Sequence, residues 1–128
     1  GLPSGRRFYY FNPEVKQVVK FGRPKLQLHH YGLRKNKTYG EVATYGGKLI
    51  ENMVQAIARD VLMEGMMQAE QAGYPCIASI HDEIVTIRKI GEGSAKELEE
   101  IICRMPRWAQ GIPLTAEGFE CRPRYRKG

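Results

Sequence analysis

Apolar residues recur at helical spacing in one long segment of the chain. Ile50, Val54, Ile57 and Val61 fall on one face of a helix with 3.6 residues per turn, and together they predict a helix over residues 48–72. A Gly-Gly pair precedes this segment and a Gly-Tyr-Pro sequence ends it. The pattern therefore predicts a long amphipathic helix with one apolar face.

Shorter apolar and aromatic runs predict strands and a second helix. Residues 76–87 show two β-type runs around a polar centre, which is typical of a hairpin. Residues 94–105 open with a Ser-x-x-Glu capping box and predict an amphipathic helix with Leu98, Ile101 and Ile102 on its buried side. Before the long helix we predict a strand over 6–11 ended by an Asn-Pro turn, one or two short strands within 14–29, including 25–29, and a long loop or extended segment over 30–47. After the second helix we predict a closing strand over 112–119, followed by a basic tail, so that these two elements fill residues 112–128.

The order of these elements indicates one α+β unit over residues 1–128, in which an antiparallel sheet carries helices packed on one face. A chain of 128 residues can bury one modest core. No run approaches the roughly 20 apolar residues that span a membrane, and the first residues lack the apolar core of a signal peptide. Three widely spaced cysteines form neither a disulfide framework nor a zinc knuckle, so we expect reduced thiols and a cytoplasmic protein.

The net charge of +6 is unevenly distributed along the chain. Residues 1–48 carry +8, residues 49–121 carry −6, and residues 122–128 carry +4. Basic ends around an acidic centre suit a polyanion that is held at the edges of a metal site. A solvated basic arm explains the same charges equally well.

The centre of the predicted hairpin carries the sequence His81-Asp82-Glu83. Two adjacent carboxylates repel each other, and a divalent cation removes that cost. Catalysis of phosphoryl transfer requires such a cation. Polar residues at a hairpin tip are common, however, and by themselves this trio is a weak signal.

A second stripe of the long helix carries polar side chains. Lys48, Asn52, Gln55 and Arg59 fall on this stripe and all of them are hydrogen-bond donors, with Glu51 at its margin. A solvent-facing surface is the usual explanation for such a stripe, although a solvent-facing surface usually mixes Glu with Lys.

Taken together, these segments resemble family A DNA polymerases of the bacterial DNA polymerase I type, with the phage-like branch matching best. Residues 44–60 are similar to the late palm helix, and residues 80–85 look like motif C, the palm hairpin with a metal-binding Asp. Residues 2–7 resemble the Gly-Arg strand after the fingers, and residues 112–119 the closing palm strand. The resemblance covers nearly the whole chain in family order and implies the C-terminal portion of a palm, with residues 1–47 as basic strands and an extended loop.

This resemblance implies roles for particular residues in DNA-directed DNA polymerisation, a nucleotidyltransferase reaction. Asp82 would be a ligand of two catalytic Mg²⁺ ions, Glu83 a neighbouring acid that tunes the site, and His81 a contact to the primer-terminal backbone. Gln55 would read the minor groove at the primer end, where A·T and T·A present the same acceptors. Further DNA contacts are expected from Asn52, Lys48, Arg59, Arg6 and Arg7.

The chain lacks parts that the family uses for catalysis. It contains two aspartates. Besides Asp82 there is Asp60, which lies inside the predicted helix away from Gln55, where a helix-fixing or salt-bridge role suits it better than metal binding. We find no motif A strand and no fingers helix; Lys37 and Tyr45-Gly46 match the fingers spacing only superficially, since Gly40 interrupts them. We therefore expect a fragment or split subunit, inactive alone, that needs primer–template DNA, a deoxynucleotide and another chain carrying motif A and the fingers.

Two other functions fit part of the sequence. The aromatic, basic residues 6–11 could bind single-stranded nucleic acid without any chemistry. The chain could also be a scaffold or processivity subunit that keeps the palm architecture. A binding module would be sensitive to salt but indifferent to magnesium and to a primer–template junction.

Overall fold

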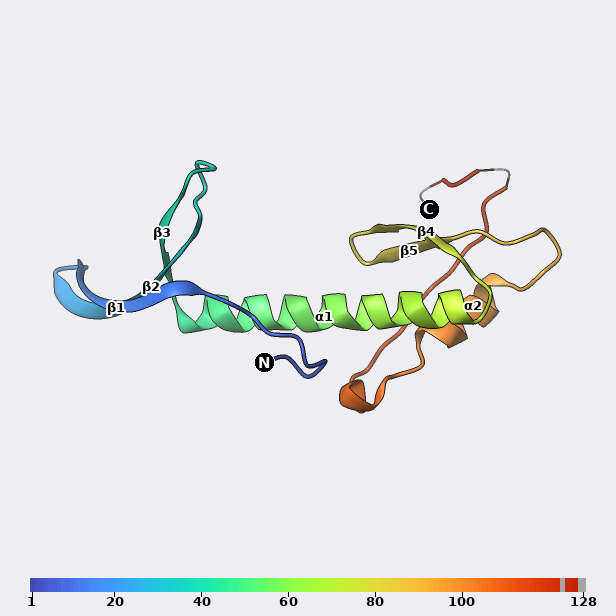
Figure 1. The fold of residues 1–128 in the computed structure, drawn as a ribbon, viewed down its shortest axis with the longest axis horizontal. Helices are drawn as coiled ribbons and strands as arrows, with labels where there is room; N and C mark the ends of the chain where they lie inside the picture. Colours follow the sequence, from blue (N-terminus) through green and yellow to red (C-terminus); the bar gives the residue numbers. More distant parts are fainter. Residues whose placement is uncertain (123, 127–128) are drawn as a thin grey trace. The chain divides into compact units, whose positions relative to one another are not determined.

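The computed structural model describes residues 1–122 and 124–126. It confirms an α+β fold in which both sheets are antiparallel. The elements are shown in Figure 1 and are β1 (Phe11–Lys20), β2 (Arg23–Leu33), β3 (Tyr39–Thr44), α1 (Gly46–Gln71), β4 (Cys76–Ile80), β5 (Glu83–Thr86), α2 (Ala95–Ile102) and the short 3₁₀ helix η1 (Arg107–Ala109). The chain divides into two compact units, Gly1–Ala56 and Ile57–Gly128.

The first unit contains a three-stranded sheet in the order β1-β2-β3. β1 and β2 confirm the strands expected within residues 14–29, including 25–29, but the strand expected over 6–11 is wrong. Residues 6–10 lie outside β1, and the Asn12-Pro13 pair lies within β1, where a register shift between Phe11 and Glu14 and a φ of 43° at Asn12 mark an irregularity. The segment 30–47, expected to be a long loop or an extended segment, is partly extended, because it contributes the end of β2 and all of β3. Hydrogen bonding to β2 orders these Gly- and Tyr-rich residues as strand.

The N-terminal segment of the first unit packs along the first half of α1. Leu2 and Ala56 are both buried. A guanidinium nitrogen of Arg6 lies 3.4 Å from the carbonyl oxygen of Ala56. The hydroxyl of Tyr10 accepts a hydrogen bond from Nδ2 of Asn52 at 3.3 Å, and its ring meets the ring of His30 edge-on. Residues 1–10 therefore form an irregular segment that is fixed by side-chain contacts.

Helix α1 is confirmed within two residues of its expected bounds. Its predicted apolar face is only partly covered: Ile57 and Val61 are half-buried, while Ile50 is 62% and Val54 60% exposed. In the first unit the covered side of the helix is instead the one that carries Ala56. The periodicity therefore identified an amphipathic helix correctly, but half of its apolar face has no cover within the described residues.

The second unit has a small core at the base of the β4–β5 hairpin. Ala69, Tyr74 and Ile101 are buried together, and Cys76, Leu98 and Ile102 pack against them, which confirms the predicted buried side of α2. The Arg88 guanidinium carbon lies 4.3 Å from the centre of the Tyr74 ring. These contacts fix the two ends of the hairpin and so position its tip.

The capping of α2 is confirmed in part. The Oγ of Ser94 accepts a hydrogen bond from the backbone N–H of Glu97, as a capping box requires. The reciprocal donor, the Ser94 N–H, is bonded to the hydroxyl of Tyr74 at 3.2 Å and not to the Glu97 side chain. The helix ends at Ile102, before the expected Met-Pro stop.

The closing segment differs from the sequence prediction. Residues 112–119, all of them described, form no strand. Gly118 donates its backbone N–H to a carboxylate oxygen of Glu99 at 2.6 Å, so one side-chain contact ties this segment to α2. In the basic tail Arg122 is paired with Glu120, while Lys127 lies outside the described residues.

Candidate functional site

The candidate carboxylates lie at the tip of the β4–β5 hairpin, as the sequence predicted. Ile80 pairs with Glu83, so His81 and Asp82 form a two-residue loop. His81 has a φ of 53°, a left-handed value that favours glycine, whereas Asp82 is not in that region. A positive φ at the first of two loop residues is the feature of a type II′ turn. A non-glycine residue at that position stores local strain next to the candidate carboxylate Asp82.

The side chains of the tip differ in their surroundings. His81 and Asp82 are exposed, and Glu83 is half-buried. The hydroxyl of Tyr125 donates a hydrogen bond to Oε1 of Glu83 at 2.6 Å. This hydrogen bond, with some burial, raises the pKa of Tyr125 above its ordinary value of 10.0. Tyr125 was not predicted as a site residue, and no local pattern in the sequence links it to the hairpin.

Arg59 ties α1 to the same tip. One of its guanidinium nitrogens donates to the backbone carbonyl of His81 at 3.4 Å. The contact is to the backbone, so it holds the strained loop residue without using the imidazole. The structure thus brings Arg59, His81, Asp82 and Glu83 together within the second unit.

The donor set at the tip fits a hard divalent cation in kind. Asp82 and Glu83 offer carboxylate oxygens, the ligand type that Mg²⁺ prefers. The described residues contain no group of three or more His, Cys, Asp or Glu side chains able to hold a metal ion. Two carboxylates are too few for a two-metal site, so these residues could contribute to such a site only with ligands from elsewhere.

The predicted DNA contacts on the first half of α1 lie in the first unit. Glu51, at the margin of the polar stripe, contacts two of them. Lys48 Nζ lies 3.4 Å from its Oε2, and Gln55 Nε2 donates to its Oε1 at 3.2 Å. Asn52 is half-buried and bonded to Tyr10. A ligand of Lys48 or Gln55 would therefore have to compete with Glu51.

The two N-terminal arginines have different surroundings in the same unit. Arg6 faces the carbonyl oxygen of Ala56, and Arg7 is exposed. Their role in binding DNA stays a prediction.

All three cysteines are free, as expected, and Cys76 has a structural position. Its backbone N–H donates to a carboxylate oxygen of Glu70 at 2.7 Å, and its thiol lies 3.6 Å from the Met66 carbonyl oxygen. Burial, with the nearby Glu70 charge, raises the pKa of the Cys76 thiol above 9.0. The thiol is therefore protonated at neutral pH and anchors β4 to α1.

Comparison with known proteins relates this chain to DNA polymerases. It is 42% identical over 118 residues to the DNA polymerase of Bacillus phage SP02. The match covers 92% of this chain and 18% of the phage protein, so the chain spans less than a fifth of its relative's length. No family model and no solved structure match the chain. No helix among the described residues is long and apolar enough to cross a membrane.

Proposed function

We propose that this chain is part of a DNA-directed DNA polymerase, equivalent to the C-terminal portion of a family A palm. The observation that carries the proposal is the 42% identity to a phage DNA polymerase over 118 residues. Any stretch of 118 residues in a chain of 128 contains positions 11–118, so the hairpin tip and α1 lie inside the matched region. The adjacent carboxylates at an exposed tip support a role in catalysis.

In this proposal Asp82 is a ligand of catalytic magnesium, and Glu83 is a neighbouring acid that helps to hold it. Bound magnesium would supply charge neutralisation for the attack of a primer 3′ hydroxyl on a deoxynucleotide. Arg59 fixes the tip through the His81 carbonyl, and the exposed imidazole of His81 is free to approach the primer backbone. Gln55, once released from Glu51, would donate to minor-groove acceptors at the primer end.

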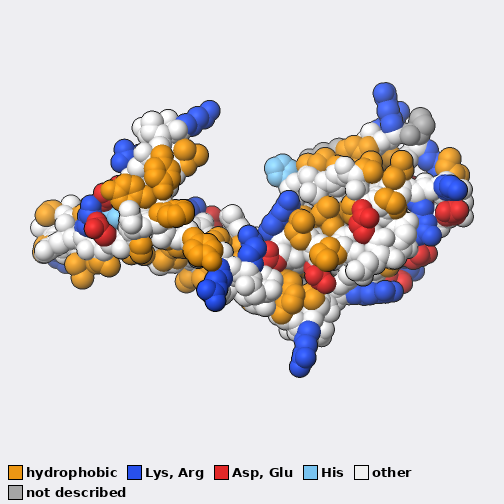
Figure 2. All heavy atoms as spheres, viewed as in Figure 1, with side chains coloured by type: hydrophobic (Ala, Val, Ile, Leu, Met, Phe, Trp, Pro, Cys, Tyr) orange, Lys and Arg blue, Asp and Glu red, His pale blue; other side chains and the backbone are white. Residues whose placement is uncertain are grey.

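We further propose that a second chain, carrying motif A and the fingers, completes the enzyme. The exposed apolar surface supports this partner (Figure 2). In the first unit Val19 is 78% and Leu26 70% exposed, and the apolar face of α1 is open at Ile50 and Val54. Large exposed apolar patches mark interfaces. A partner that covers them would resemble the other half of a divided core.

The test begins with recovery of the chain from its native source together with any bound protein. The recovered complex is then assayed for magnesium-dependent primer extension. Asp82→Asn should abolish extension while primer–template binding persists, since the loss removes a cation ligand and not a DNA contact. Glu117→Gln removes one carboxylate charge from an exposed site in the same unit and should extend normally.

Normal extension by the Asp82→Asn complex would refute the catalytic assignment. Recovery of no polymerase chain, with nucleic-acid binding that is salt-sensitive but independent of magnesium, would favour the binding-module or scaffold function instead.

A further inference from the structure

The turn between β1 and β2 carries an aromatic side chain in an unusual position. Lys20 pairs with Arg23, which leaves Phe21 and Gly22 as a two-residue loop. Phe21 has a φ of 53° and Gly22 a φ of 72°, and positive values at both positions are the feature of a type I′ turn. Such turns favour Asn or Gly at the first position, and a bulky residue there is strained.

Neither folding nor packing accounts for the ring of Phe21. Its side chain is 97% exposed, so it contributes nothing to the core of its unit. A less strained residue would serve the turn better. A ring held out in water on a strained turn therefore points to a role in binding.

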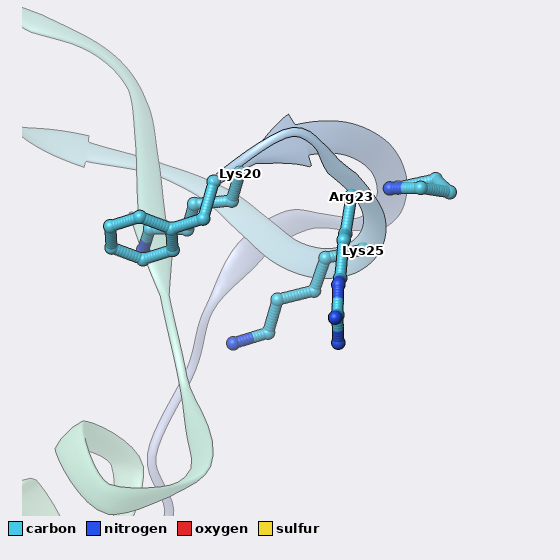
Figure 3. Close-up of a pocket in the computed structure, with 5 residues that line it drawn as sticks. Lys20, Arg23 and Lys25 are labelled. Carbon is cyan, nitrogen blue, oxygen red and sulfur yellow. The ribbon is translucent and has the colours of Figure 1, made fainter.

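Three cations line the same hollow as this ring. Lys20, Arg23 and Lys25 line one hollow of the surface together with Phe21 and Pro24 (Figure 3). Within residues 1–122 and 124–126 no carboxylate is paired with any of the three. Lys16, on the same strand as Lys20, differs, because its Nζ lies 2.7 Å from Glu41 Oε1. The positive charge at the turn is thus uncompensated.

We propose that this turn is a binding site for single-stranded nucleic acid, with Phe21 as a stacking platform and Lys20, Arg23 and Lys25 as phosphate contacts. Unpaired bases expose faces that stack on an aromatic ring, and cations beside the ring follow the backbone. In a duplex the base faces are already stacked and cannot use the ring. The site requires neither a metal ion nor a partner chain, and it is separate from the residues proposed for catalysis.

The test uses the full chain and a fluorescently labelled dT12 oligonucleotide, with EDTA present, and measures anisotropy at several salt concentrations. Phe21→Asn removes the ring but supplies the residue that the turn prefers. It should bind the oligonucleotide about tenfold more weakly while the fold is retained or strengthened. Phe21→Trp should bind as well as the original chain or better.

The cations are tested by the triple change Lys20→Gln, Arg23→Gln and Lys25→Gln. Each phosphate contact on a single strand contributes about 0.7 to the slope of log affinity against log salt, so the slope should fall by about 2. The matched control, Lys89→Gln, Lys96→Gln and Arg107→Gln, removes the same charge from exposed positions of the other unit and should leave the slope near its original value.

Three results would overturn the proposal. One is unchanged dT12 binding in Phe21→Asn; another is an equal loss in the two triple variants. The third is equally tight, ring-independent binding of poly-glutamate, which would identify a docking site for an acidic protein. Because no catalysis is measured, failure here is distinguishable from failure of the Asp82→Asn test.

Discussion

Replacement of Gly93 by alanine should destabilise the second unit by way of the core residue Tyr74. Gly93 has a φ of 68°, and a Cβ at this position would lie 2.8 Å from Tyr74 Cζ and closer still to its hydroxyl oxygen. Tyr74 is 4% exposed, so its ring has little room to move. The same hydroxyl accepts the Ser94 N–H at the start of α2. One methyl group therefore disturbs the core, a helix cap and the Arg88 contact at the base of the hairpin.

The magnitude follows from two contributions. A left-handed φ costs an alanine about 1 kcal/mol. Loss of the hydrogen bond between Tyr74 and Ser94 costs about 1 kcal/mol more, with an additional cost for the displaced ring. We expect a total of about 2–4 kcal/mol. Gly91→Ala is the matched control, because Gly91 has a φ of 88° but its Cβ would have no neighbour within 4 Å, so it should cost only about 1 kcal/mol.

The assay is urea denaturation followed by the fluorescence of Trp108, the only tryptophan of the chain, which lies in the same unit as both glycines. With a typical slope of about 1–3 kcal/mol per molar urea, the two variants should differ in midpoint by about 1 M. Equal midpoints for Gly91→Ala and Gly93→Ala would refute the reasoning, since only Gly93 has Tyr74 as a neighbour.

Two further predictions concern the sheet and the helix contact. The hydrogen bond from Lys16 lowers the pKa of Glu41 below its ordinary value of 4.5, so the stabilisation from this ion pair is present above pH 4.5 and is lost as the pH falls through the lowered value. Glu41→Gln should therefore flatten the fall of the melting temperature at acid pH, measured by thermal denaturation with circular dichroism. An unchanged fall would contradict the ion pair. The pKa of Lys16 is raised above 10.5, and its contribution should be lost only as the pH rises through that raised value. Gly65→Ala should leave the stability of the second unit unchanged or raise it by up to about 1 kcal/mol through helix propensity. The reason is that the new Cβ would meet Ile102 at an acceptable 3.4 Å. A loss of stability above about 1 kcal/mol in the urea assay would show that α1 and α2 pack more tightly than described.

The elements that the sequence predicted well are those specified by local signals. Helix α1 follows from its apolar period and from the Gly-Tyr-Pro sequence after it, and α2 follows from Ser94 and the capping box. The β4–β5 hairpin follows from two apolar runs around a polar tip, so the positions of Asp82 and Glu83 in the fold were predictable.

The remaining features depend on contacts between distant residues. β3 is rich in Gly and Tyr and becomes a strand because β2 pairs with it, while Asn12 and Pro13 are accommodated by an irregular β1. The hydrogen bond between Tyr125 and Glu83 joins residues 42 positions apart, and no periodicity predicts it. Local patterns indicated that α1 is amphipathic but could not indicate which part of the apolar face is covered.

The hydrogen bond between Tyr125 and Glu83 makes the tail of the chain a competitor at the hairpin tip. Any cation that takes Oε1 of Glu83 must displace the Tyr125 hydroxyl, which occupies that oxygen at 2.6 Å. Displacement would remove the main cause of the raised pKa of Tyr125, so the phenol would ionise more readily when the site is filled. Ultraviolet difference absorbance at alkaline pH would then report occupancy of the site, with Tyr125 as the one of the seven tyrosines that changes.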